Sequence, residues 1–312
     1  MRARWLVTAL IWGCGRTEVV DFFPSAPAAP AAVVDAGRVD AGRADAGRPD
    51  AGGPDAGVVD AGRRDAGVDA GRPEIGLAQS DVLYVNEENQ LFSFAPATGA
   101  LVRLTGLSCR GATDLAIDRS GRAWVVTGFG LFRVNVQSGT CTPVSRLPEP
   151  LVALTVLPAG VLDQLNETLV GYGETAYWEF DPNDGLASRL GTSALSGGLV
   201  PSGDLTALSD GGTFLSVRDR AWPSARPDEL VRIDPLTGAV IEQLGPIALA
   251  NVWGLATFDD DLYAFNDVGR ISRLSIEDGG VRSTLLASPP GRRFWGAAAR
   301  PGARSAPRDG GP

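Results

Sequence analysis

A strand-and-turn unit occurs five times between residues 81 and 302, and it limits the possible folds more than any other part of the sequence. The copies alternate apolar and polar residues and end in a glycine turn: LFSFAPATG (91–99), LFRVNVQSG (131–139), YWEFDPNDG (177–185), LVRIDPLTG (230–238) and ISRLSIEDG (271–279). The alternation predicts β-strands, and the turn residues before each glycine predict hairpins. The closing glycines are 40, 46, 53 and 41 residues apart. A repeat of this length is typical of arrays such as β-propellers.

Two more strand-like runs precede each copy, and one follows it. The runs expected nearest the centre are DLAIDRSG (114–121), ALTVLPAG (153–160), DLTALSDG (204–211) and GLATFDD (254–260). Four short antiparallel strands in a unit of about 45 residues form the blade of a β-propeller.

The two ends of the repeat region predict how the ring closes. The first unit begins at its second strand, VLYVNEE (82–88), and lacks an inner strand, whereas WGAAARPG (295–302) follows the last complete unit and matches the inner-strand pattern. A shared blade removes two exposed sheet edges, and a solenoid needs no such complement. We therefore predict an all-β fold, a five-bladed propeller of four-stranded antiparallel blades over 75–302 that is closed by a C-terminal strand.

In its turns of the form LxxφDPxTG, clearest in LVRIDPLTG (230–238), the repeat region resembles the broad superfamily of YncE-like and NHL-like propellers. The resemblance covers about 220 residues. It implies the fold and leaves the activity open, because one fold serves many functions. Bacterial lipoproteins that carry Asp-Ala-Gly linkers are similar in overall layout.

The first residues predict an export signal. Arg2 and Arg4 precede an apolar run of eight residues (5–12), which is shorter than the roughly 20 residues that span a bilayer. One interpretation is an ordinary signal peptide that contains a cysteine. The other is a lipobox, because IWGC (11–14) resembles the lipoprotein cleavage pattern, although Trp12 is bulkier than usual. That resemblance implies removal of 1–13, a lipid anchor on Cys14 and, since glycine rather than aspartate follows Cys14, an outer-membrane location.

Residues 14–74 are predicted to be a disordered tether. Their centre is an Asp-Ala-Gly repeat with aspartates at 35, 40, 45, 50, 55, 60, 65 and 69, and it matches neither the helical nor the strand period. Such a segment cannot bury enough apolar surface to offset its chain entropy. A calcium-binding repeat is the alternative, but each unit has a single carboxylate, and six interspersed arginines largely neutralise the run. Residues 303–312 are predicted to be a disordered tail.

Composition argues against several classes of function. The chain has no histidine and a net charge of −9, so a Ser-His-Asp arrangement and a basic surface for nucleic acid are both excluded. The motifs GxSxG, HExxH and CxxC are also absent. We therefore predict no catalytic residue, no metal site and no cofactor, and expect a monomer that binds a ligand and touches the membrane only through its anchor.

The candidate binding surface is one face of the ring, which we call the mouth. It is the face reached by the loops that enter the inner strands and by those that join the second and third strands of each blade. The residues predicted there are Arg110, Asp114, Asp204, Trp222, Trp253 and Trp295. They suit a protein, peptide or glycan. The alternative is structural: the tryptophans pack between blades, and the aspartates accept hydrogen bonds from the loop backbone.

Cys109 and Cys141 are disulfide candidates, since they are the two cysteines of the predicted propeller and an exported chain meets an oxidising compartment. Our strand assignment, however, places Cys109 at the mouth and Cys141 on the opposite face. Bridging needs α-carbons within about 7 Å. The sequence leaves the pairing open.

Two further functional hypotheses remain. The first is a calcium-dependent hydrolase of the propeller lactonase kind, which requires three or more carboxylate or amide side chains converging in the channel. Asp114 and Asp204 are the aligned candidates. The second is a structural envelope protein with no discrete ligand.

Overall fold

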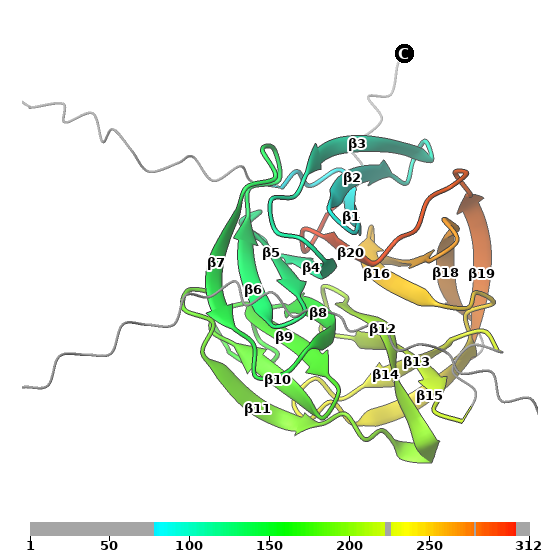
Figure 1. Ribbon diagram of the computed structural model, residues 1–312. Coiled ribbons are helices and arrows are strands. Elements are labelled where there is room, and N and C mark those ends of the chain that lie inside the picture. The colour runs from blue at the N-terminus through cyan, green and yellow to red at the C-terminus, as the bar shows by residue number, and fades with distance from the viewer. Residues whose placement is uncertain (1–77, 222–225, 278, 304–312) are drawn as a thin grey trace, which may run out of the picture. The chain divides into compact units, whose positions relative to one another are not determined.

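The computed structural model describes residues 78–221, 226–277 and 279–303. Within these ranges twenty strands form five four-stranded antiparallel sheets arranged around a central axis, as Figure 1 shows. Outside the described residues lie the predicted signal peptide, the whole predicted tether with Cys14, the predicted tail apart from Ala303, and Trp222. Among the described residues, no helix is long and apolar enough to cross a membrane.

Each blade runs from an inner strand at the axis to an outer strand at the rim. In that order, blade 1 consists of β20 (Gly296–Ala299), β1 (Leu83–Glu87), β2 (Gln90–Ala95) and β3 (Ala100–Gly106). Blade 2 consists of β4 (Ala112–Ile117), β5 (Ala123–Thr127), β6 (Gly130–Val134) and β7 (Cys141–Arg146). Blade 3 consists of β8 (Leu151–Leu157), β9 (Thr168–Gly173), β10 (Ala176–Phe180) and β11 (Ala187–Thr192).

The last two blades are built in the same way. Blade 4 consists of β12 (Leu199–Ala207), β13 (Thr213–Asp219), β14 (Glu229–Ile233) and β15 (Val240–Pro246), and the short 3₁₀ turn η1 (Ser196–Gly198) precedes it. Blade 5 consists of β16 (Val252–Phe258), β17 (Asp261–Asn266), β18 (Ile271–Glu277) and β19 (Gly280–Ala287). The prediction of five four-stranded blades is confirmed.

The ring closes as the sequence predicts, through a blade shared by the two ends of the repeat region. β20 pairs antiparallel with β1, with Leu83 opposite Ala299 and Asn86 opposite Gly296. The packing extends one residue past the predicted boundary at 302. Ala303 is buried, and its carbonyl accepts a hydrogen bond of 3.0 Å from the amide of Asp259.

The core lies between neighbouring blades. Tyr84 of blade 1, for example, packs in one buried cluster with Leu115 and Val125 of blade 2. An inner blade strand is covered on both faces, whereas an outer strand borders solvent. β9 is therefore buried along its whole length, while most of β3 is exposed. This is why apolar residues are denser in the inner strands than strict alternation predicts.

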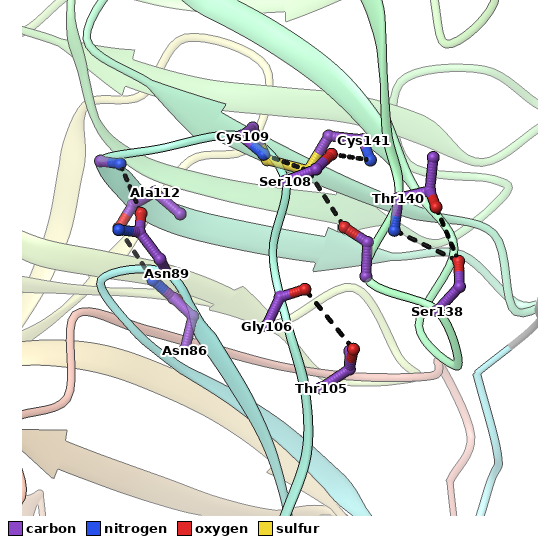
Figure 2. Close-up of a disulfide and its surroundings, with 12 residues drawn as sticks. Asn86, Asn89, Thr105, Gly106, Ser108, Cys109, Ala112, Ser138, Thr140 and Cys141 are labelled. Carbon is purple, nitrogen blue, oxygen red and sulfur yellow. Dashed lines mark hydrogen bonds between the residues drawn. A yellow bond between two sulfur atoms is a disulfide. The ribbon is translucent and has the colours of Figure 1, made fainter.

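The structure contains a disulfide between Cys109 and Cys141, whose α-carbons are 5.6 Å apart (Figure 2). The prediction that the two cysteines lie on opposite faces is therefore wrong. The amide of Ser108 donates to the carbonyl of Gly139 over 2.9 Å, so the β6–β7 turn lies against the segment that leaves β3.

The physical reason for this correction is sheet twist. A right-handed twist accumulates over the four strands of a blade. The twist rotates the hairpin between the third and fourth strands of a blade relative to the inner strands. The turn of this hairpin therefore contacts the mouth end of the outer strand of the preceding blade. The same contact recurs around the ring, where Gly185 lies beside Ser145 and Thr237 lies beside Gly191. Assigning residues to one face or the other as if each blade were flat is therefore correct for the inner strands and wrong for the outer strands.

Candidate functional site

Equivalent positions of the five inner strands meet at the ring axis, just below the mouth. These positions carry Asp114, Ala153, Asp204, Gly254 and Gly296, which immediately precede Leu115, Leu154, Leu205, Leu255 and Ala297. Register shifts, the mark of a β-bulge, occur at this level in β4, β8, β12 and β16. A bulge leaves backbone groups out of the ladder, so amides here are free to point elsewhere.

Two carboxyl groups accept these amides. Asp114 accepts from Leu115 (2.7 Å) through Oδ1 and from Leu154 (2.6 Å) through Oδ2. Asp204 accepts from Leu205 (2.6 Å) through Oδ1, and its Oδ2 accepts from Leu255 (2.6 Å) and Ala297 (3.4 Å). One N–H of every inner strand is thus bonded to what we call the axial pair, Asp114 and Asp204. The two aspartates therefore accept backbone hydrogen bonds, as the structural alternative expects, but from strand amides rather than from loops.

The axial pair is fully buried, and the two carboxyl groups are close enough to interact electrostatically. Burial, which penalises the charged form, raises the pKa of both carboxyls, and for Asp114 the neighbouring charge of Asp204 raises the pKa further. The amide hydrogen bonds oppose this rise, because they stabilise the charged form.

A third polar side chain, Asn86 of β1, joins the axial pair, and our sequence analysis missed it. Asn86 is fully buried, and its Nδ2 donates to the carbonyl of Ala112 over 2.9 Å (Figure 2). The corresponding positions of β5, β9 and β17 carry Val126, Tyr172 and Phe265. The second strands of the other blades carry mostly large apolar residues at this position. The asparagine at 86 is therefore the sequence signal that could have identified this residue.

Trp253 and Trp295 lie on the mouth side of the axis, one residue before Gly254 and Gly296. Their ring centroids are 5.7 Å apart with the planes inclined by 40°, and the guanidinium carbon of Arg218 is 5.8 Å from the Trp253 ring. Both tryptophans are only partly buried. The structure therefore brings the two predicted tryptophans together as one aromatic surface.

A hollow of about 370 Å³ lies beside Trp295. It is lined by Glu87, Glu88, Asn89, Gln90, Gly291, Arg293 and Trp295. Arg110 is exposed near it, since the neighbouring amide of Gly111 donates to Asn89 Oδ1 over 2.9 Å. Arg110, Trp253 and Trp295 thus surround the mouth, whereas Asp114 and Asp204 are buried beneath it.

Asp228 is a third buried carboxylate near the mouth, and our sequence analysis missed it. Its Oδ2 accepts a hydrogen bond of 2.6 Å from the amide of Val252, next to Trp253. Burial raises the pKa of Asp228 to about 6, although the hydrogen bond from Val252 and the charge of Arg218 oppose the rise. A lone Asp ahead of a strand carries no sequence signal that separates this role from that of an ordinary turn residue.

Among the described residues, no three or more His, Cys, Asp or Glu side chains are arranged so that they alone could hold a metal ion. With the amide of Asn86, the axial pair makes a group of three oxygen-bearing side chains. Three carboxylate or amide side chains therefore converge at the axis, which is the feature that the hydrolase hypothesis requires.

No protein-family model matches this chain, and no curated protein matches its sequence. Similar solved structures include a protein of unknown function from Bacteroides caccae (13% identity, TM-score 0.40, 66% of this chain and 73% of that one). Another comes from work on the de novo evolutionary emergence of a symmetrical protein (14% identity, TM-score 0.49, 71% and 99%). A third is the hydrazine synthase of Kuenenia stuttgartiensis (12% identity, TM-score 0.42, 73% and 71%). The strand pairing itself establishes that the domain is a five-bladed β-propeller.

Proposed function

We propose that this protein is a tethered envelope lipoprotein whose propeller binds a protein, peptide or glycan at its mouth. The observation that carries the proposal is the partly exposed Trp253–Trp295 surface beside the 370 Å³ hollow. Tryptophan offers a large apolar area together with an N–H donor, and buried aromatic anchors dominate the energy of many interfaces. Glu87, Glu88 and Arg293 line the hollow and offer polar contacts that would orient a ligand.

The mouth is tested by capture from envelope extracts. We expect Trp222, Trp253 and Trp295 changed together to alanine to lose the partner that the wild-type propeller retains. The matched control is Leu165→Ala, which removes an exposed apolar side chain in the loop between β8 and β9, at the end of the ring opposite the mouth. Equal recovery by the triple variant and the wild-type protein would refute binding at the mouth.

The lipid anchor rests on Cys14 and needs its own test. We expect radiolabelled palmitate to be incorporated into the full-length protein and to remain with the outer-membrane fraction. Cys14→Ser should abolish the label and release the protein. A labelled Cys14→Ser protein, or an unlabelled wild type, would contradict the anchor.

A calcium-dependent hydrolase is the second candidate, favoured by the convergence of Asn86, Asp114 and Asp204 at the axis. Full burial of all three argues against it, because a catalytic ion must meet its substrate. A panel of lactones assayed with and without EDTA decides between the two. EDTA-sensitive turnover would support the hydrolase, and its absence would remove that candidate.

A further inference from the structure

A buried oxygen without a hydrogen-bond donor lies at the centre of the ring. Asn86 is fully buried, and the hydrogen bond from its Nδ2 to the Ala112 carbonyl determines which way the amide points, because a flipped amide would set two oxygens against each other. Asn86 Oδ1 then has no donor among the described residues. A buried polar atom in this position costs free energy unless an ion or a water molecule satisfies it.

The space that Asn86 Oδ1 faces is the one left by the missing side chain of Gly296. A Cβ atom at Gly296 would lie 2.7 Å from Asn86 Oδ1 and would overlap Asp114 Oδ1. Both oxygens therefore border the same small volume, and the Asp204 carboxyl lies next to it, since its Oδ2 accepts from the amide of Ala297, the residue after Gly296. Glycine at 296 keeps this volume open.

The oxygens around this volume outnumber their donors. Asp204 Oδ2 already accepts two amides, whereas Asp204 Oδ1 and both oxygens of Asp114 accept one backbone amide each. With Asn86 Oδ1, four oxygens retain a lone pair, and the two carboxyl groups carry negative charge when they are ionised. Buried carboxylates need a compensating positive charge or a proton. Either a proton on the pair or a cation at this point supplies that compensation, and a cation also satisfies Asn86 Oδ1.

We propose that the ring axis binds a hard divalent cation, best matched by Ca²⁺, through Asn86 Oδ1, Asp114 and Asp204. The donors are all oxygens, which suits Ca²⁺ or Mg²⁺ rather than a metal that prefers nitrogen or sulfur. Ca²⁺ tolerates an irregular ligand set, whereas Mg²⁺ demands a near-ideal octahedron. Water completes the coordination. The three side chains come from blades 1, 2 and 4, so the ion stabilises the closed ring independently of ligand capture at the mouth.

The test begins with the full chain freed of metal by EDTA and then titrated with CaCl₂, with MgCl₂ as the comparison. We expect one saturable calcium site by calorimetry and a rise in Tm that EDTA reverses. Asn86→Leu should weaken calcium binding by about tenfold or more, because it removes one ligand. Asn86→Asp keeps a ligand oxygen and should retain the site. Asn183→Leu, in the exposed turn between β10 and β11, is the matched control and should bind like the wild-type protein.

Two results would overturn the proposal. One is the absence of both saturable calcium binding and a calcium-dependent Tm in the wild-type protein, a measurement that needs no variant to fold. The other is equal affinity of the wild-type and Asn86→Leu proteins, which would place the ion elsewhere. Loss of partner capture in the triple tryptophan variant with calcium binding intact would show that the two sites are separate.

Discussion

At the scale of single residues, Asp204 is the acceptor for three inner-strand amides, and its removal should be costly. Asp204→Ala leaves the N–H groups of Leu205, Leu255 and Ala297 buried without an acceptor. Each such group costs about 1–3 kcal/mol, so we expect a loss of at least ~3 kcal/mol in the free energy of unfolding. Urea titration followed by tryptophan fluorescence measures it. Asp204→Asn keeps one acceptor oxygen and should lose less; equal losses would contradict the account.

Asp228, again a single residue, should make the free energy of unfolding depend on pH. Its pKa is raised to about 6 in the folded protein from 3.8, so the folded state binds the proton more tightly than the unfolded state does. The resulting stabilisation is fully present below pH 3.8 and is lost as the pH rises through about 6. Relative to the wild-type protein, Asp228→Asn should therefore gain on the order of 2 kcal/mol between pH 4 and pH 7. If the free energies of unfolding of the two proteins change by the same amount between pH 4 and pH 7, the raised pKa of Asp228 is contradicted.

At the scale of elements, the disulfide ties the outer hairpin of blade 2 to the segment that leaves β3. Cys109 and Cys141 are 32 residues apart, and a bridge of that span stabilises by about 3–4 kcal/mol in the chain-entropy account. We expect the Cys109→Ala/Cys141→Ala protein to unfold at lower urea than the oxidised wild-type protein. Dithiothreitol should destabilise the wild type alone. A reductant effect on the double variant would point to another cause.

At the scale of the whole molecule, closure by β20 should decide whether the ring folds. β20 covers β1 of blade 1, and it also presents the Ala297 amide to Asp204. A chain that ends at residue 295 leaves the edge of β1 unpaired, and an unpaired strand edge is a template for pairing with other chains. We expect it to aggregate or dimerise in light scattering, whereas a chain that ends at residue 303 should stay monomeric with an unchanged Tm. A monomeric, fully stable chain ending at 295 would contradict the closure argument.

The blade count, the four strands of each blade and the closing strand could all be predicted from the amino-acid sequence. Each of these follows from local turn chemistry and from alternation along one segment, which the chain carries within a few residues. The grouping of Trp253 with Trp295 at the mouth follows in turn, because both occupy the same position in successive inner strands. Because the strand-and-turn unit is repeated around the ring, a pattern that is local within each unit predicts the architecture of the whole domain.

The contacts at the axis and at the rim, in contrast, depend on how distant segments pack in space. Asn86 joins Asp114 and Asp204 because β1 pairs with a strand more than 200 residues away, so no single segment contains the cluster. Cys109 meets Cys141 because twist accumulates over four strands, a quantity that strand alternation does not encode. The burial of the axial pair likewise arises from five strands converging on one axis, and this burial made the two aspartates acceptors for the ring rather than exposed contacts for a ligand.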